Sequence, residues 1–230
     1  MIFLNPVFFL KGNHYLLESL FMLKYKTNFK KYLELLEETI NDPQFPVNDN
    51  ITSLSFLYLY NNKLNYHILE GTFAESEYLI PEVLDKINLH NEHLDEHHEM
   101  LFYYKIACIY FGNEKYNECV FYLEKIINNK NLYVREDLAC FARLLCLIAH
   151  YESGKDFNLE NQLVSTYKFL IKMNDLHEVQ KEIIRFLKKL STIYPSDIKK
   201  EFIKVKERFV ELEKNTYEKR AFLYLDIISW

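Results

Sequence analysis

Glycine and proline are scarce in this chain of 230 residues, which contains four glycines and five prolines. A sheet-rich fold needs frequent tight turns, and tight turns depend on glycine, proline, asparagine and aspartate. Asparagine is plentiful, but the shortage of glycine argues against many short strands. We therefore expect a fold built from long helices.

Cysteine is also rare, and its four positions form no C-x-x-C pair: Cys108, Cys119, Cys140 and Cys146. All four fall in apolar stretches, which is typical of buried free thiols in a reducing compartment. The spacing argues against a disulfide framework or a zinc ribbon.

Long hydrophobic runs are missing as well. The apolar residues 1–10 are interrupted by Asn5-Pro6, follow no basic residue and precede no small-residue cleavage site, so they do not read as a signal peptide. No stretch reaches the roughly 18 to 20 apolar residues that spanning a bilayer requires. We expect a soluble, cytoplasmic protein with no membrane partner.

Charge of one sign is not in large excess, because the net charge is −5. The whole chain therefore gives no electrostatic reason to bind nucleic acid. Residues 165–210 differ, with eleven Lys and Arg against six Asp and Glu. Within them Lys181, Arg185, Lys188 and Lys189 recur at one-turn spacing and form a candidate face for phosphates or an acidic partner. Nucleic-acid binding through this face is one alternative function; a solvated surface is the other interpretation.

Hydrophobic residues make up 49% of the sequence, which is enough to bury a core. Glycines and aromatic residues recur along the chain with a period of about forty residues. Gly71, Gly112 and Gly154 are 41 and 42 residues apart, and an aromatic follows each; Phe29 extends the aromatic series backwards. A helix, a turn with glycine and a second helix opened by an aromatic would form a hairpin, and hairpins must stack to bury their apolar faces.

The repeat predicts an all-α, right-handed α-solenoid of antiparallel helix pairs, forming a single domain over residues 1–230. The expected pairs are 14–25 with 28–41, 51–70 with 73–88, 95–111 with 115–128, and 136–153 with 158–173. Helices over about 176–229 would cap it at the C-terminal end, with Asp175-x-x-Glu178 as a capping box and 217–229 as the last helix. Pro81 predicts a kink or a break within 73–88.

The third pair carries the sharpest pattern, Ile106-Ala107-x-x-Tyr110 followed by Tyr116-x-x-Cys119-x-x-x-Leu123-x-x-Ile126. This pattern resembles the tetratricopeptide repeat, with Cys119 at a position where alanine is usual. Segments 64–73, 102–112, 165–170 and 218–222 are similar to tetratricopeptide-like proteins of Bacteroidota. The resemblance implies a helical-repeat fold over most of the chain and no particular activity.

A cluster of histidines and acids at residues 90–99 contains His93-x-x-Glu96-His97, the pattern of inverted zincins. On a helix the two histidines would share a metal and Glu96 would act as the base of a metal-dependent hydrolase. That chemistry also needs a third ligand, for which Asp175 and Glu178 are candidates only by default. The cluster also falls at an expected connection between repeats, where polar residues need no explanation beyond solvation, and this is the favoured interpretation. We therefore expect no metal and no cofactor.

Neither a phosphate-binding glycine loop nor a nucleophile elbow is present, so we expect no enzymatic activity. The favoured function is a scaffold or adaptor that binds a protein or peptide on the concave face of the solenoid. The register predicts six side chains on that face: Asn61, Asn65, Leu101, Tyr104, Cys108 and Phe111. Burial of Tyr104 inside its hairpin would contradict this register. The partner and the oligomeric state stay open.

Overall fold

The computed structural model describes residues 5–89, 94–129, 136–154, 159–173, 177–190, 193–194, 197–218 and 221–222. Over these residues the regular secondary structure is helical throughout and includes no strand, as the shortage of glycine predicted. The chain divides into two compact units, Met1–Tyr122 and Leu123–Trp230. In the described ranges, no helix combines the length and the apolar character needed to cross a membrane.

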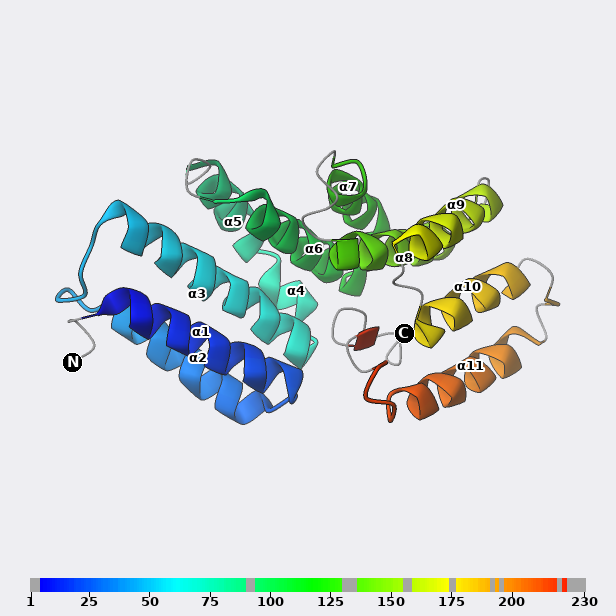
Figure 1. The fold of residues 1–230 in the computed structure, drawn as a ribbon, viewed down its shortest axis with the longest axis horizontal. Coiled ribbons are helices and arrows are strands. Elements are labelled where there is room, and N and C mark those ends of the chain that lie inside the picture. The colour runs from blue at the N-terminus through cyan, green and yellow to red at the C-terminus, as the bar shows by residue number, and fades with distance from the viewer. Residues whose placement is uncertain are drawn as a thin grey trace. The chain divides into compact units, whose positions relative to one another are not determined.

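Unit 1 is organised around α3 (Asp49–Glu70), which packs against α1 (Pro6–Met22), α2 (Lys26–Ile40) and α6 (Glu96–Gly112). Figure 1 shows α1 and α2 side by side, with α3 lying along them. Residues 55–62 of α3 are all buried, because neighbouring helices cover this helix on several sides. The short α4 (Phe73–Ser76) and α5 (Leu79–Leu89) also contact α3 and α6, and α7 (Tyr116–Ile127) follows.

The first helix begins earlier than the predicted residue 14. Asn5 accepts a hydrogen bond from the Phe8 backbone N–H at 3.1 Å, and Pro6 occupies the first helical position. Asparagine before a helix and proline at its first position are both favoured start signals. The Asn5-Pro6 pair therefore starts α1, and the prediction of 14–25 was wrong about the beginning of this helix.

Two turns in unit 1 share one backbone design. After α1, the Lys24 N–H donates to the Phe21 carbonyl and the Tyr25 N–H donates to the Leu20 carbonyl. After α6, the same two bonds join residues 114 to 111 and 115 to 110. Lys24 and Glu114 both adopt a left-handed backbone, with φ of 54° and 59°. This recurrence after 90 residues shows that the chain turns in the same way after α1 and after α6.

The regularly spaced glycines serve two different purposes. Gly71 and Gly154 adopt left-handed backbones with φ of 75° and 66°, as expected for turn glycines. Gly112 instead is the last residue of α6, and a Cβ there would lie 2.3 Å from the Phe73 ring. The expectation that Gly112 supplies a turn was therefore wrong, since its role is to let the Phe73 ring approach the helix.

Pro81 does accompany a break in the predicted helix 73–88, but the break comes before it. Helix α4 ends at Ser76 and α5 starts at Leu79, so Pro81 lies in the first turn of α5. In that position a missing backbone N–H removes no hydrogen bond within the helix.

Unit 2 contains α8 (Glu136–Glu152), α9 (Leu159–Lys172), α10 (Glu178–Leu190) and α11 (Ile198–Leu212), close to the predicted ranges. Helix α9 contacts α8 and α10, and α10 also contacts α8 and α11. Phe186 of α10 meets Phe202 of α11 edge to face, with ring centroids 4.7 Å apart. Of the predicted last helix 217–229, only Ala221 and Phe222 are described as helical, and both are buried.

The start of α10 is capped differently from the prediction. The buried Glu218 carboxylate accepts the backbone N–H groups of Glu178 at 3.2 Å and Val179 at 3.1 Å. The His177 N–H donates to the Gln180 side chain at 2.8 Å, which is half of a capping box displaced by two residues. Asp175 lies outside the described residues. The predicted role of Glu178 was wrong, because its own N–H is the group that is capped.

Candidate functional site

Polar side chains from three helices of unit 1 meet in one connected row, which we call the polar seam: His14, Tyr58, Asn61, Asn62 and Lys105. The His14 ring of α1 stacks on the Tyr58 ring of α3, with centroids 4.4 Å apart and planes 17° apart. The Asn62 side-chain nitrogen lies 3.3 Å from His14 Nδ1. These contacts connect α1 to α3 through polar groups within an otherwise apolar packing surface.

Asn62 holds the centre of this row and is fully buried. Its side-chain NH2 donates to the Tyr58 carbonyl oxygen at 2.7 Å, one helical turn earlier. Since that bond requires a donor, the amide orientation is fixed and Nδ1 of His14 is the acceptor of the second bond. Among the described residues, no donor reaches the buried Asn62 Oδ1 atom. A buried carbonyl oxygen in this state keeps its full capacity to accept a donor.

Lys105 extends the polar seam from α3 to α6. Its ammonium group donates to the Asn61 side-chain oxygen and lies 3.4 Å from the Asn61 backbone oxygen. Helices usually satisfy their own carbonyl groups, so a lysine that binds both oxygens of one residue is a specific link between two helices. The contact joins α3 to α6 across a sequence separation of 44 residues.

The electrostatics of the polar seam keep His14 neutral. Burial, with smaller electrostatic contributions from Lys105 and His98, lowers the pKa of His14 to about 4. Burial also raises the pKa of the Tyr58 hydroxyl, assisted by Tyr15 and Glu18. At neutral pH the seam therefore combines one lysine charge with neutral donors and acceptors.

Asn65 lies one turn beyond Asn61 on α3 and is also buried, with 5% of its surface exposed.

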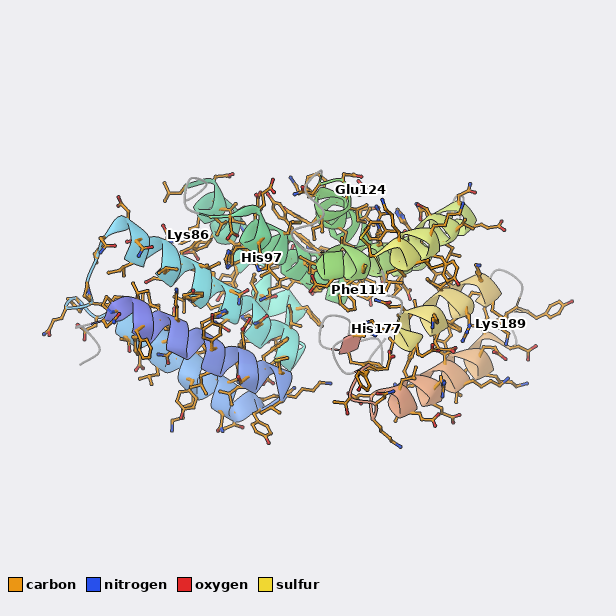
Figure 2. The ribbon with its side chains drawn as sticks, viewed as in Figure 1. Lys86, His97, Phe111, Glu124, His177 and Lys189 are labelled. Atoms are coloured by element: carbon orange, nitrogen blue, oxygen red, sulfur yellow. The ribbon has the colours of Figure 1, made fainter. Side chains whose placement is uncertain are left out.

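The six predicted concave-face residues have different surroundings. Leu101, Cys108 and Phe111 are half-buried, and the Phe111 ring (labelled in Figure 2) packs edge to face on Tyr116 with centroids 5.5 Å apart. Asn61, Asn65 and Tyr104 are buried, at 6%, 5% and 3% exposure. The expected open position of these three is therefore wrong, because packing around α3 and α6 encloses their side chains. Whether the six residues contact a partner stays a prediction.

The sequence analysis missed four members of the polar seam: His14, Tyr58, Asn62 and Lys105. His14 looked isolated, because nothing in the sequence brings residue 14 near residue 62. One signal was present, since Asn61-Asn62 follows a run of five apolar or aromatic residues, 56–60. Two adjacent amides in a buried helix require partners, and that requirement points to neighbouring helices.

Three of the four basic side chains on the face of α10 form ion pairs, two with acids of α10 and one with an acid of α11. Lys181 pairs with Glu178 at 2.6 Å, and Arg185 pairs with Glu182 at 2.5 Å. Lys189 (labelled in Figure 2) pairs with Glu201 of α11, and Lys188 lies 5.8 Å from the Tyr167 ring centre. Each predicted phosphate contact therefore has an internal partner, which weakens the electrostatic case for nucleic acid.

The histidine cluster is only partly described, because His93 lies outside the described residues. Asp95 begins α6 by accepting the His98 backbone N–H at 2.9 Å, and it also lies 2.6 Å from His98 Nδ1. These bonds hold the pKa of Asp95 below its usual value, against an opposing effect of burial. Over the described ranges, no group of three or more His, Cys, Asp and Glu side chains is arranged to hold a metal.

Comparisons of the chain with protein-family models, with curated proteins and with solved structures gave no match. The geometry of the polar seam is therefore the main guide to function.

Proposed function

We propose that this chain is a tetratricopeptide-like helical-repeat protein that binds an extended segment of a partner protein. The binding face would be formed by α1, α3 and α6, the first helices of successive antiparallel pairs in a right-handed solenoid. The four free cysteines suit a reducing location such as the cytoplasm. The proposal gives the chain a scaffold or adaptor role and no catalytic step.

The observation that carries the proposal is the accessible side of α6. Leu101, Lys105, Cys108 and Phe111 are half-buried and recur at steps of four, three and three residues, so they share one side of the helix. An extended peptide presents apolar side chains and C=O groups along its length, and this row offers apolar surface together with one ammonium group.

Selectivity would come from the side chains of this row. Leu101 and Phe111 offer aliphatic and aromatic surface, and the Lys105 ammonium favours a carbonyl or acidic group close to Asn61. Because His14 is neutral at pH 7, it adds no second positive charge. The partner segment is therefore expected to be extended, partly apolar and neutral or acidic.

Affinity capture with the full chain tests the proposal. A photo-crosslinking amino acid at Leu101 should attach to a partner protein in native lysate, and the same group at the exposed Tyr78 should not. The charge reversal Lys105→Glu should abolish the capture, whereas Lys30→Glu on the exposed side of α2 should leave it unchanged.

Two results would contradict the proposal. Capture that both lysine variants retain would place the binding site elsewhere on the molecule. Capture that disappears with nuclease would favour the nucleic-acid alternative and the face around Lys181 and Arg185.

A further inference from the structure

Helix α1 has a second apolar face that no described part of the chain covers. Its buried stripe is Leu10, Leu17 and Leu20, on the side that packs against α2 and α3. On the opposite side the exposed fractions are 76% for Phe8, 63% for Tyr15 and 58% for Met22. We call the line of Phe8, Gly12, Tyr15, Ser19 and Met22 the outer face of α1.

The spacing of these residues makes the outer face continuous. Steps of four, three, four and three residues keep all five side chains on one side of a helix. Leu16 and Leu23, exposed to 38% and 59%, widen the face along one edge. A surface helix normally turns polar residues to solvent, so an apolar line of four turns is typical of an interface.

The order of side-chain sizes along the outer face indicates which molecule covers it. The order is large, small, large, small, large, and it reads the same from either end of the helix. In an antiparallel pair of identical helices centred near Tyr15, Phe8 of one copy meets Met22 of the other, and Gly12 meets Ser19. Large residues fill the ends, while the small residues let the backbones approach.

The charges beside the outer face follow the same symmetry. Lys11 and Glu18 are seven residues apart, so they lie on one edge of the helix, four residues before and three residues after Tyr15. An antiparallel pair related by a two-fold axis brings this edge of each copy against the same edge of the other. Lys11 of one copy then lies level with Glu18 of the other, twice per pair.

We infer that α1 is a dimerisation helix and that its outer face is covered by α1 of a second copy of this chain. Gly12 supports this, because an added Cβ there meets no described atom within 4 Å. Nothing in the described part of one copy requires glycine at this position, and an exposed glycine inside a helix costs about 1 kcal/mol relative to alanine. This inference is independent of the polar seam and of the proposed partner.

Sedimentation equilibrium of the full chain tests the pairing. The wild-type chain should be a dimer, and Tyr15→Glu should make it a monomer, since two carboxylates would meet at the two-fold axis. Tyr78→Glu is the matched control, because Tyr78 is 70% exposed in unit 1 and is not on α1. Circular dichroism should show the same helix content in all three proteins.

A charge-reversal cycle tests the antiparallel geometry itself. Lys11→Glu alone and Glu18→Lys alone should each raise the dimer dissociation constant about threefold to thirtyfold, since two symmetry-related exposed pairs are lost. The double variant should return to the wild-type value. A wild-type chain that stays monomeric, or a dimer that survives Tyr15→Glu, would overturn the inference. Single reversals without effect, or a double variant as weak as the singles, would overturn the antiparallel arrangement.

Discussion

Replacing Gly112 with alanine tests the reason for the second periodic glycine. An added Cβ would lie 2.3 Å from both Cγ and Cδ2 of Phe73 and 2.7 Å from Cδ1. Ordinary contacts of this kind are at about 3.5–4.0 Å, so the ring must move by more than 1 Å. Rotating the ring about its own axis does not help, because Cγ lies on that axis. We therefore expect Gly112→Ala to destabilise unit 1 by about 1–3 kcal/mol.

Urea denaturation followed by circular dichroism gives the free energy, and hydrogen exchange of α4 and α6 locates the change. In a double-mutant cycle, Phe73→Ala should remove most of the cost of Gly112→Ala, because the clashing atoms are gone. Gly12→Ala is the matched control and should stabilise the chain by about 0.5–1 kcal/mol, since a Cβ there meets nothing. This control should be measured in a chain that also carries Tyr15→Glu. Gly12 lies on the outer face of α1, and Tyr15→Glu removes the inferred self-association through that face.

The outcome that would refute the reasoning is specific. If Gly112→Ala is neutral or stabilising, α6 can move away from Phe73 at no cost, and the close approach is not what requires glycine. An equal cost with and without Phe73 would mean that the penalty arises from the helix end rather than from the ring.

Three further predictions concern the turns, the α10 cap and the polar seam. Lys24→Gly should stabilise the chain by about 1 kcal/mol in urea denaturation, because glycine adopts a φ of 54° without strain. Glu218→Gln should destabilise unit 2 by about 1–3 kcal/mol in the same assay, since the carboxylate accepts two N–H groups of α10, whereas the exposed Glu207→Gln should be neutral. Because the pKa of His14 falls from 6.5 to about 4 in the folded chain, stability should be full above pH 6.5 and decline by up to about 3 kcal/mol towards pH 4, and His14→Gln should flatten that profile.

The helical fold could be predicted because its signals are local. Apolar residues at steps of three and four define the faces of helices such as α6 and α11, and the glycine spacing marks the ends of α3, α6 and α8. Lys24 and Glu114 show the limit of this approach, since their left-handed backbones give no compositional signal. The Asn5-Pro6 pair is a start signal for α1. The same pair also interrupts the apolar run 1–10, and the sequence analysis gave it only that second meaning.

The candidate site could not be predicted in the same way, because its contacts join distant parts of the sequence. Asn61 and Asn65 were identified by the helical register, which assigned them to an open concave face; neither their burial nor the Lys105 contact of Asn61 was predicted. His14 is 48 residues from Asn62, and Lys105 is 44 residues from Asn61. Only packing of α1, α3 and α6 brings these groups together. The same packing buries Tyr104, which the helical pattern alone assigned to an open surface.

The Glu218 cap has a consequence for how unit 2 folds during synthesis. Helix α10 emerges from the ribosome before α11, yet two of its first backbone N–H groups bind a carboxylate 39 and 40 residues further along the chain. Until residue 218 has left the ribosome, those N–H groups have no protein acceptor, and the first turn of α10 lacks the favourable negative charge. Helix α10 should therefore fray at its start even after its own residues have emerged. Its first turn becomes stable only when Glu218 has emerged and can accept these two N–H groups.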